Sequence, residues 1–210
     1  MRIAIIGAGN VGSALAAVAV KAGHTVTIAA AHADKAADVA AATGAQAAAS
    51  SAAAVTGADL VVLAVPAGAV KAVAAEIAGS LAGAPVVDAT NPLNATFDGL
   101  DIEGVSFAHD VQGFLPGAPV VKALNTLFAS RYAAPSENGQ PLDAFIAGDD
   151  AAAKATVAAF TESLGLRPVD VGDLRKARSL EEMAFLNITL NAGNGWSWQT
   201  GWQLAGPTAA

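Results

Sequence analysis

The sequence predicts an α/β fold built on a doubly wound, mostly parallel sheet. Three observations support this prediction. Short runs of aliphatic, β-branched residues alternate with helical patterns, the connections between them are short, and the first apolar run leads directly into a glycine-rich turn. We expect a single domain over residues 1–210, with a core over about 1–125 and a small C-terminal α/β extension over about 126–210.

The first strand and its turn are the strongest signal. The apolar run Arg2–Ile6 leads into Gly-x-Gly-x-x-Gly and then into a helix expected over residues 10–22. In this pattern, typical of a Rossmann-type dinucleotide-binding domain, Gly7 permits a tight turn, Gly9 lets the backbone approach a pyrophosphate, and Gly12 allows close helix packing. The helix N-terminus then favours an anion. The predicted pyrophosphate-binding residues are Gly7, Ala8, Gly9, Asn10, Val11 and Gly12.

The remaining elements follow from hydrophobic period and turn residues. Further strands are expected over about 24–29, 45–48, 59–65, 85–88, 120–124, 142–147 and 167–171. Further helices are expected over about 33–44, 51–55, 67–81, 150–164 and 173–190.

Composition limits the possible functions. The net charge of −7 argues against nucleic acid as a partner, because phosphate binding requires basic patches. The absence of cysteine excludes disulfides, thiolate catalysis and cysteine-ligated metal sites, and no metal site is predicted.

Membrane insertion is not expected, although hydrophobic residues make up 54% of the chain. The longest apolar stretch, 60–87, contains Pro66, Lys71 and Glu76, so it cannot be one span. The N-terminal run superficially resembles a signal peptide, but three glycines and Asn10 interrupt it. A cytoplasmic location without a membrane partner is therefore expected.

The end of the second strand favours NADP over NAD. An NAD-selective site usually places an acidic residue there, to bond the ribose 2′-hydroxyl. No acidic residue occurs before Asp34, and no arginine is present to bind a 2′-phosphate. Only His32 and Lys35 can supply positive charge nearby, although His32 can equally be a solvated surface histidine. The predicted cofactor-binding residues in this region are Ala30, Ala31, His32 and Lys35.

Ligands in such sheets bind outside the carboxyl ends of the strands. We expect the loops there to surround the nicotinamide and its partner, with contributions from Ala64, Val65, Pro66, Asn91, Pro92, Asn125, Thr126, Leu127 and Ala129. These loops carry small residues and neutral amides, so no catalytic acid or base is predicted. A hydride acceptor that is itself a flavin-like ring would need only positioning.

Four titratable residues near these loops are not assigned a catalytic role. Asp88 lies at the end of a strand and is expected to be a partner for loop backbone as readily as a site residue. His109 and Asp110 are expected on a solvated surface helix, and Lys122 in its strand is ambiguous.

The whole set of motifs resembles the F420-dependent NADP reductases, and is also similar to the reductase domain of membrane metalloreductases. The resemblance rests on the segments 6–12, 22–24, 121–126, 147–150 and 166–172, with Leu174, Arg178 and Glu181 or Glu182 in the last helix. It implies hydride transfer between NADP(H) and C5 of the deazaflavin coenzyme F420.

The resemblance also implies residue roles. Residues 9–11 would hold the pyrophosphate, Lys35 would lie near the 2′-phosphate, and Asn91, Pro92 and the loop 127–129 would border the ring pocket. The chain departs from the family at two places. Ala30 and Ala31 replace a Ser-Arg pair, and Phe128 replaces part of a small, proline-bearing loop, which can narrow the deazaflavin site. Arg131, Arg175 and Arg178 could offset the acidic balance toward an anionic coenzyme.

All three tryptophans lie in the tail 195–202. We expect an aromatic seal over the sheet or a contact in a homodimer, in preference to a wall for a flavin-like ring. The preceding helix also suits a subunit interface through one apolar face, formed by Leu174, Ala177, Leu180, Ala184 and Ile188. Two alternatives for function stay open: a flavin or quinone reductase on the same fold, and a non-catalytic NADP(H)-sensing protein.

Overall fold

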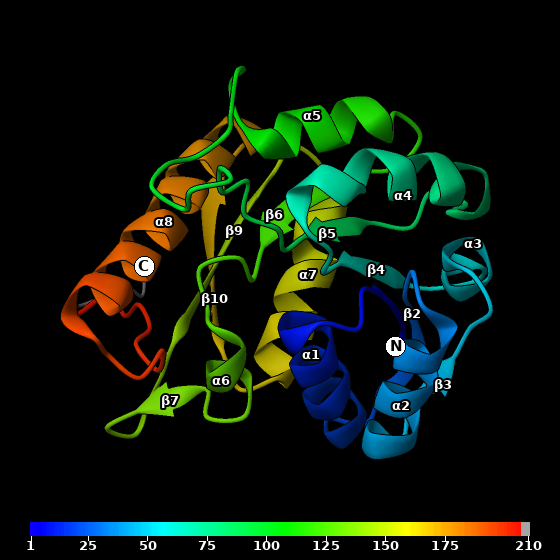
Figure 1. The fold of residues 1–210 in the computed structure, drawn as a ribbon, viewed down its shortest axis with the longest axis horizontal. Helices are drawn as coiled ribbons and strands as arrows, with labels where there is room; N and C mark the ends of the chain where they lie inside the picture. The colour runs from blue at the N-terminus through cyan, green and yellow to red at the C-terminus, as the bar shows by residue number, and fades with distance from the viewer. Residues whose placement is uncertain (207–210) are drawn as a thin grey trace.

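The computed structural model describes residues 1–206, which form one eight-stranded sheet with helices on both faces and a separate two-stranded hairpin (Figure 1). The sheet contains β1 (Arg2–Ile6), β2 (Thr25–Ala29), β3 (Gln46–Ala47), β4 (Leu60–Leu63), β5 (Val86–Asp88), β6 (Val120–Ala123), β9 (Asp143–Gly148) and β10 (Arg167–Gly172). The hairpin pairs β7 (Ser136–Glu137) with β8 (Gln140–Pro141). The helices are α1 (Asn10–Lys21), α2 (Ala33–Thr43), α3 (Ser51–Val55), α4 (Val70–Ile77), α5 (Phe107–Phe114), α6 (Ala129–Tyr132), α7 (Ala151–Ser163) and α8 (Ala177–Asn194).

The strand order confirms the doubly wound prediction. Across the sheet the order is β10-β9-β6-β5-β4-β1-β2-β3. All neighbours pair in parallel except β6 and β9, which are antiparallel with Val121 opposite Gly148. The first six strands therefore have Rossmann order, with the reversal of winding between β1 and β4, where this fold binds its ligands.

Alternate residues of the strands fill two cores. Ile3 and Ile5 pack with the cluster under α1, α2 and α7, whereas Ala4 and Ile6 pack with the cluster under α3, α4 and α5. Because both faces are covered, the central strands are apolar throughout, as parallel sheets require. Burial of each isoleucine side chain contributes about 1.5–3 kcal/mol.

The C-terminal extension enlarges the sheet and closes one end of it. In Figure 1, α8 and the tail lie beside α5, β9 and β10, at the opposite end from α2 and α3. A third core cluster joins these parts and includes Ala108 of α5, Phe145 of β9, and Leu180 of α8. None of the helices within residues 1–206 is long and apolar enough to cross a membrane.

Most predicted bounds agree with the structure to within about two residues, except in two helices, and a third, smaller difference occurs at the end of one strand. The helix expected over 67–81 is α4 flanked by 3-10 turns at Ala67–Ala69 and Ala78–Ser80, because Gly68 and Gly79 weaken α-helix at both ends. The final helix begins at Ala177 after a 3-10 turn, continues beyond residue 190, and ends at Asn194.

The third difference is in β6, which ends one residue earlier than expected. Leu124 has a φ of 65°, a left-handed conformation that cannot continue a strand. The chain therefore turns sharply toward Asn125 and Thr126.

The apolar face proposed for a subunit interface was assigned wrongly. Leu174, Ala177, Leu180 and Ala184 are buried within the chain, mostly against Phe145 and Ala147 of β9. The helical spacing was correct, but it reflects packing on the protein's own sheet. A homodimer stays a prediction, and that face is not available to form it.

The three motif glycines have the distinct environments that their predicted roles require. A Cβ on Gly7 would lie 2.2 Å from the Ala64 carbonyl oxygen, and Gly7 has a φ of 122°. A Cβ on Gly12 would lie 1.8 Å from the Gly7 carbonyl oxygen. A Cβ on Gly9 would meet no atom within 4 Å. The first and third glycines thus serve the fold, whereas Gly9 leaves open space beside the turn.

Replacement of Gly12 by alanine should therefore destabilise the protein by about 1–3 kcal/mol, because the new methyl group has no room. Gly9→Ala is the matched control and should cost less than about 1 kcal/mol, the range for an N-cap exchange. Urea unfolding of both variants measures the difference. Equal losses would contradict the assigned close approach of α1 to β1.

Candidate functional site

Two neighbouring cavities open at the carboxyl ends of the parallel strands. The glycine-loop cavity, of about 510 Å³, is lined by Ile6, Gly7, Ala8, Gly9, Ala30, Ala31, His32, Lys35, Ala49, Ser50, Ser51, Ala64, Val65, Pro66, Ala69, Val73 and Glu76. The amide cavity, of about 460 Å³, is lined by Asn10, Val11, Asn91, Asn125, Thr126, Leu127, Phe128, Ala129, Ser130, Ala184, Ile188, Ser197 and Trp198. The glycine loop separates them, since Gly9 lines the first and Asn10 the second.

The structure brings nearly all predicted binding residues to these cavities. The exceptions are Gly12 and Pro92, which line neither. Gly12 is buried beneath the turn, against the Gly7 carbonyl. Pro92 is also buried, and its carbonyl oxygen accepts a hydrogen bond from the Asp101 amide. Both residues support loops that line the cavities.

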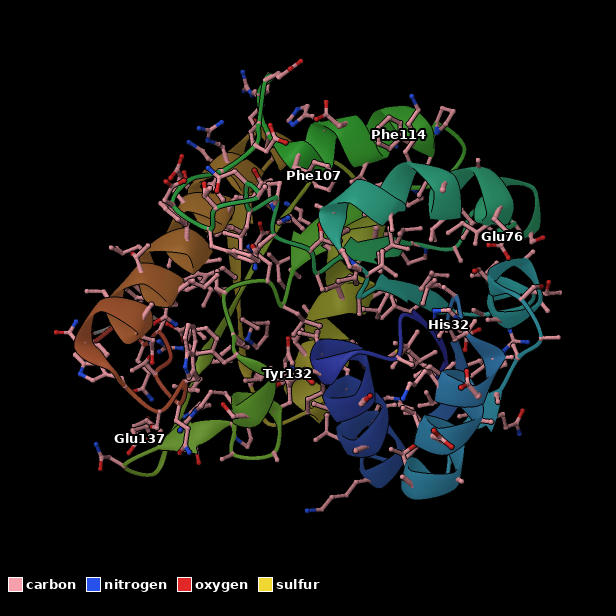
Figure 2. All side chains as sticks on the ribbon, viewed as in Figure 1. His32, Glu76, Phe107, Phe114, Tyr132 and Glu137 are labelled. Carbon is pink, nitrogen blue, oxygen red and sulfur yellow. The ribbon has the colours of Figure 1, made fainter. Side chains whose placement is uncertain are left out.

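Charged groups occur at one end of the glycine-loop cavity. Figure 2 shows His32 and Glu76 on the same side of the molecule, near α2 and α3. His32 is the N-cap residue of α2, but its side chain makes no capping hydrogen bond. The Glu76 carboxylate accepts hydrogen bonds from the amide and the hydroxyl of Ser51, at 2.8 and 2.9 Å. These hydrogen bonds partly satisfy the Glu76 carboxylate, while the Lys35 ammonium and the His32 imidazole line the same cavity.

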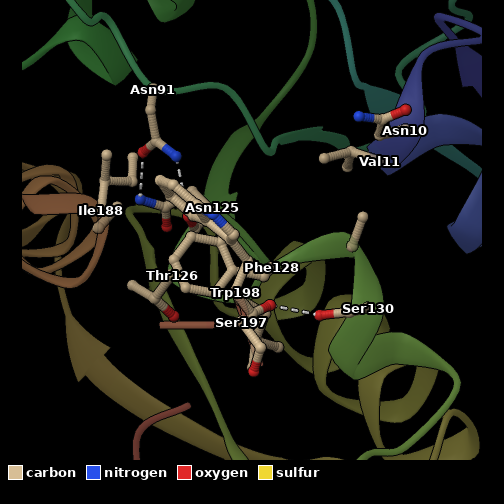
Figure 3. A pocket seen from close by; sticks show the side chains of 13 residues that line it. Asn10, Val11, Asn91, Asn125, Thr126, Phe128, Ser130, Ile188, Ser197 and Trp198 are labelled. Atoms are coloured by element: carbon tan, nitrogen blue, oxygen red, sulfur yellow. Dashed lines mark hydrogen bonds between the residues drawn. The ribbon is translucent and has the colours of Figure 1, made fainter. Parts of the chain in front are cut away.

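Two amide side chains close the floor of the amide cavity. Asn91 Nδ2 donates to the Asn125 carbonyl oxygen at 2.9 Å, and Asn125 Nδ2 donates to Asn91 Oδ1 at 3.0 Å (Figure 3). Asn125 Nδ2 also donates to the Leu180 carbonyl oxygen of α8 at 3.0 Å. These bonds fix the orientation of the Asn125 amide and join β5, β6 and α8 around the cavity.

Two buried polar atoms in this cavity have no partner among the described residues. They are Asn125 Oδ1 and Thr126 Oγ1, in side chains that are only 5% and 3% exposed. A buried polar group left unpaired costs about 1–3 kcal/mol, so such groups usually meet a ligand or ordered water. The Asn125 and Thr126 side chains line the cavity, and these two unpaired atoms are buried in its wall.

A buried ion network lies directly behind the Asn91 loop. Lys122 Nζ contacts Asp88 Oδ2 at 3.0 Å and Glu181 Oε1 at 3.2 Å, and it donates to the Thr90 carbonyl oxygen at 2.7 Å. All three charged side chains are fully buried. The network has one positive and two negative groups.

The surplus negative charge is met by backbone N–H groups. Glu181 accepts from the amides of Phe107 and Ala108 at the start of α5, where the helix dipole favours an anion. Asp88 Oδ1 accepts from the amide and hydroxyl of Thr90. The prediction that Asp88 is a partner for loop backbone is confirmed, and Lys122 proves to be structural.

Leu124 directs Asn125 and Thr126 toward the cavity. Its left-handed φ costs about 1–3 kcal/mol, which the surrounding contacts must offset. The buried Tyr132 hydroxyl donates to the Leu124 carbonyl oxygen at 2.8 Å, and burial raises the pKa of this phenol. Tyr132 therefore stays protonated and acts as a fixed donor that holds the turn.

The three arginines expected to offset coenzyme charge do not line either cavity. Arg131 pairs with Glu137, Arg175 with Asp173, and Arg178 with Glu182. The Arg175 pair lowers the pKa of the Asp173 carboxyl group. Nearby carboxylates engage each guanidinium, which sequence position alone does not reveal, and a role of these arginines toward a coenzyme stays a prediction.

The solvated-helix prediction agrees with the structure. His109 lies on α5, with its Nδ1 at 2.8 Å from the Ser106 hydroxyl at the helix start, and Asp110 is exposed. Neither residue lines a cavity.

The three tryptophans have different environments. Trp202 packs against the cluster around Phe145 and Leu174, as a seal over the sheet would, and Trp196 is exposed. Trp198 lines the amide cavity, beside Phe128 (Figure 3). A seal over the sheet therefore does not describe Trp198, because the tail folds back toward the loop after β6, and the dimer contact stays a prediction.

Sequence reasoning missed several lining residues. Ser50, Ser51 and Glu76 carry no motif, and reach the glycine-loop cavity only because α3 packs beside α4. Ala184 and Ile188 had been assigned to a subunit interface, although they line the amide cavity. No local pattern distinguishes these positions from ordinary helix residues. Among residues 1–206, no group of three or more His, Asp or Glu side chains is placed to hold a metal ion.

Comparisons with known proteins agree with this architecture. A family model described as "NADP oxidoreductase coenzyme F420-dependent" matches residues 2–92. The structure is similar to a "putative f420 dependent nadp-reductase" from Arthrobacter sp. FB24, with 32% identity and a TM-score of 0.85 over 98% of this chain and 99% of that chain. It is also similar to a hypothetical protein from Sinorhizobium meliloti, with 34% identity and a TM-score of 0.77 over 85% and 88%. No curated protein matches the sequence.

More distant structures share the fold alone. The 3-hydroxyisobutyrate dehydrogenase of Mycobacterium tuberculosis is 21% identical, with a TM-score of 0.71 over 90% of this chain and 60% of that chain. A reductive aminase from Aspergillus terreus, in complex with NADPH and ethyl levulinate, is 24% identical, with a TM-score of 0.71 over 92% and 62%.

The ion network makes a clear stability prediction. Lys122→Met leaves two buried carboxylates without their cation and should destabilise the protein by about 3–5 kcal/mol. Lys154→Met is the control, since Lys154 pairs with the exposed Asp170 and should cost at most about 1 kcal/mol. Chemical unfolding distinguishes them. A Lys122→Met variant as stable as the control would refute the structural role of this network.

Proposed function

The chain belongs to the family of F420-dependent NADP oxidoreductases, and we propose that it transfers a hydride between NADP(H) and the deazaflavin coenzyme F420. The observation that supports this most directly is the composition of the amide cavity, beside the glycine loop. It is lined by neutral amides, hydroxyls, aliphatic groups and two aromatic rings, with no acid or base among its described residues. Such a site can align two rings but cannot protonate a substrate carbonyl.

The glycine loop fits a dinucleotide pyrophosphate. The open space beside Gly9 is where a side chain would obstruct an approaching phosphate. The N-cap of α1 is Gly9 itself, which makes no side-chain capping bond, so the first N–H groups of the helix are free to donate to an anion. Residues 7–12 would hold the pyrophosphate there.

The far end of the glycine-loop cavity fits the phosphorylated ribose of NADP. Ala30 and Ala31 leave room and supply no negative charge, and His32 and Lys35 follow them. The N-terminus of α2 adds backbone donors with a favourable dipole. These groups would bind the 2′-phosphate, because no arginine lies directly after β2 in this chain.

The polar side chains that line the amide cavity would suit the edge of a ring that carries an amide. Asn125 Oδ1 requires an N–H donor, and the Thr126 hydroxyl can donate to a carbonyl oxygen. The nicotinamide carboxamide and the pyrimidine edge of a deazaflavin both provide N–H and C=O groups. Asn91, Asn125 and Thr126 would orient these edges, while Leu127 and Ala129 exclude water.

Bound NADP(H) supplies the hydride chemistry. The residues of the chain bind, orient and desolvate, and the rate depends on how well they hold the reacting partners in line. No side chain of the cavity has to gain or lose a proton.

The function is tested by mixing the purified protein with NADPH and, in parallel, with F420, FMN, FAD or a quinone, and following the nicotinamide absorbance. We expect turnover with F420 and little with the others. Turnover with FMN or a quinone alone would replace this proposal by a flavin or quinone reductase. Tight NADPH binding without any turnover would indicate a sensor.

The assignment of the 2′-phosphate site predicts a change of cofactor preference. Lys35→Ala should raise the KM for NADPH about tenfold, the range expected for loss of one charge-assisted contact, and leave the KM for NADH nearly unchanged. Lys71→Ala is the control, because the Lys71 ammonium lies over the Phe114 ring. Equal effects of Lys35→Ala on both cofactors would exclude this role for Lys35.

A further inference from the structure

The C-terminal tail is fixed to the body of the protein at several points. Asn191 of α8 is fully buried, and its Oδ1 accepts from the Trp198 amide at 3.2 Å. Its Nδ2 donates to the Thr200 hydroxyl, which in turn donates to Asn187 Oδ1, each at 2.6 Å. Beyond these, the Asp143 carboxylate accepts from the Leu204 amide at 2.6 Å. These hydrogen bonds give the tail a defined conformation, in which Trp198 lines the amide cavity.

Trp198 is held in an unfavourable conformation by these contacts. Its φ is 60°, in the left-handed region that an aromatic residue rarely adopts. The residue is bonded on both sides, because its amide donates to Asn191 and its carbonyl oxygen accepts from the Ser130 hydroxyl at 2.6 Å. Backbone strain of about 1–3 kcal/mol persists where the surrounding structure fixes it, often at ligand clamps.

The strained backbone places the indole at the edge of the amide cavity. The Trp198 and Phe128 rings are 5.3 Å apart at an interplanar angle of 80°, an edge-to-face pair. Trp198 nevertheless keeps 44% of its surface exposed although it lines the cavity. A large aromatic surface therefore remains open to a bound molecule.

The cavity has two unlike sides. Figure 3 shows Asn10 and Val11, at the start of α1, on one side and Phe128 and Trp198 on the other. The dinucleotide is expected on the side of the glycine loop, so a second ring has to lie on the side of the aromatic pair. Thr126, on the same loop as Phe128, also lines this side of the cavity.

We propose that Trp198 stacks on the conjugated ring of the hydride acceptor and thereby selects flat, conjugated acceptors over small aliphatic ketones or aldehydes. This inference rests on the proposed function, since it assumes that an acceptor binds in the amide cavity. Stacking would depend on the tail, because Asn191 and Ser130 hold Trp198 in place.

Trp196 provides a matched control. It lies two residues away on the same tail, is similarly exposed at 46%, and does not line the cavity. Trp202 is unsuitable because it packs against the core.

The kinetic test compares Trp198→Ala with Trp196→Ala, using F420 at saturating NADPH. Trp198→Ala should raise the KM for F420 about tenfold, in the range of an aromatic stacking contact, while the KM for NADPH changes less than twofold. Trp198→Phe should restore most of the affinity because it keeps an aromatic face. Trp196→Ala should leave both KM values unchanged.

A binding test needs no turnover. In one variant Trp198 is the only tryptophan (Trp196→Phe with Trp202→Phe), and in the other Trp196 is the only one (Trp198→Phe with Trp202→Phe). Titration with oxidised F420 in the presence of NADP⁺ should quench the fluorescence of the first variant much more strongly than that of the second. Melting curves confirm that both variants are folded.

The outcomes separate the two proposals. If wild-type protein turns over F420 but Trp198→Ala keeps its KM and the Trp198 fluorescence does not change, the stacking inference is overturned and the function stands. If wild-type protein fails with F420 but reduces FMN, the proposed function fails. The same variants measured with FMN then support the inference by a raised KM, or overturn it by an unchanged one.

Discussion

The site depends on the buried contact between Lys122 and its two carboxylates. This network joins β5, β6, α5 and α8, four elements that are distant in sequence. Three desolvated charges are costly unless every hydrogen bond is made, and here the Thr90 carbonyl and the first N–H groups of α5 complete the set. The ends of β5 and β6, which carry Asn91 and Asn125, are thereby held at a fixed distance.

Two residues with strained backbone conformations shape the uncharged amide cavity next to this ion network. Leu124 turns the chain after β6 with a positive φ, and Trp198 places its indole with another. Each is held by a hydroxyl donor to its carbonyl oxygen, from Tyr132 and from Ser130. The strain is local and its anchors are buried or bonded on both sides, which would suit the proposed alignment of two rings without proton transfer.

The glycine motif and the strand pattern were sufficient to predict a doubly wound, mostly parallel sheet and most residues around the cavities. They were sufficient because strand period, glycine spacing and helix starts are local properties. The errors arose from contacts between distant residues. The apolar face of α8 was interpreted as a subunit interface although it packs on β9, and the carboxylate partners of Arg131, Arg175 and Arg178 were not foreseen.

By itself, then, the sequence determined a Rossmann-type sheet with a glycine-rich turn at residues 7–12 that leads into a helix, and it predicted phosphate binding there and a site without an acid or base. Only the tertiary structure showed that Lys122 forms buried ion pairs, that Thr126 and Asn125 keep unpaired polar atoms, and that Trp198 lines the amide cavity. The reason is physical. Burial, ion pairing and the return of the tail depend on which segments meet in space, and a linear pattern does not encode those distances.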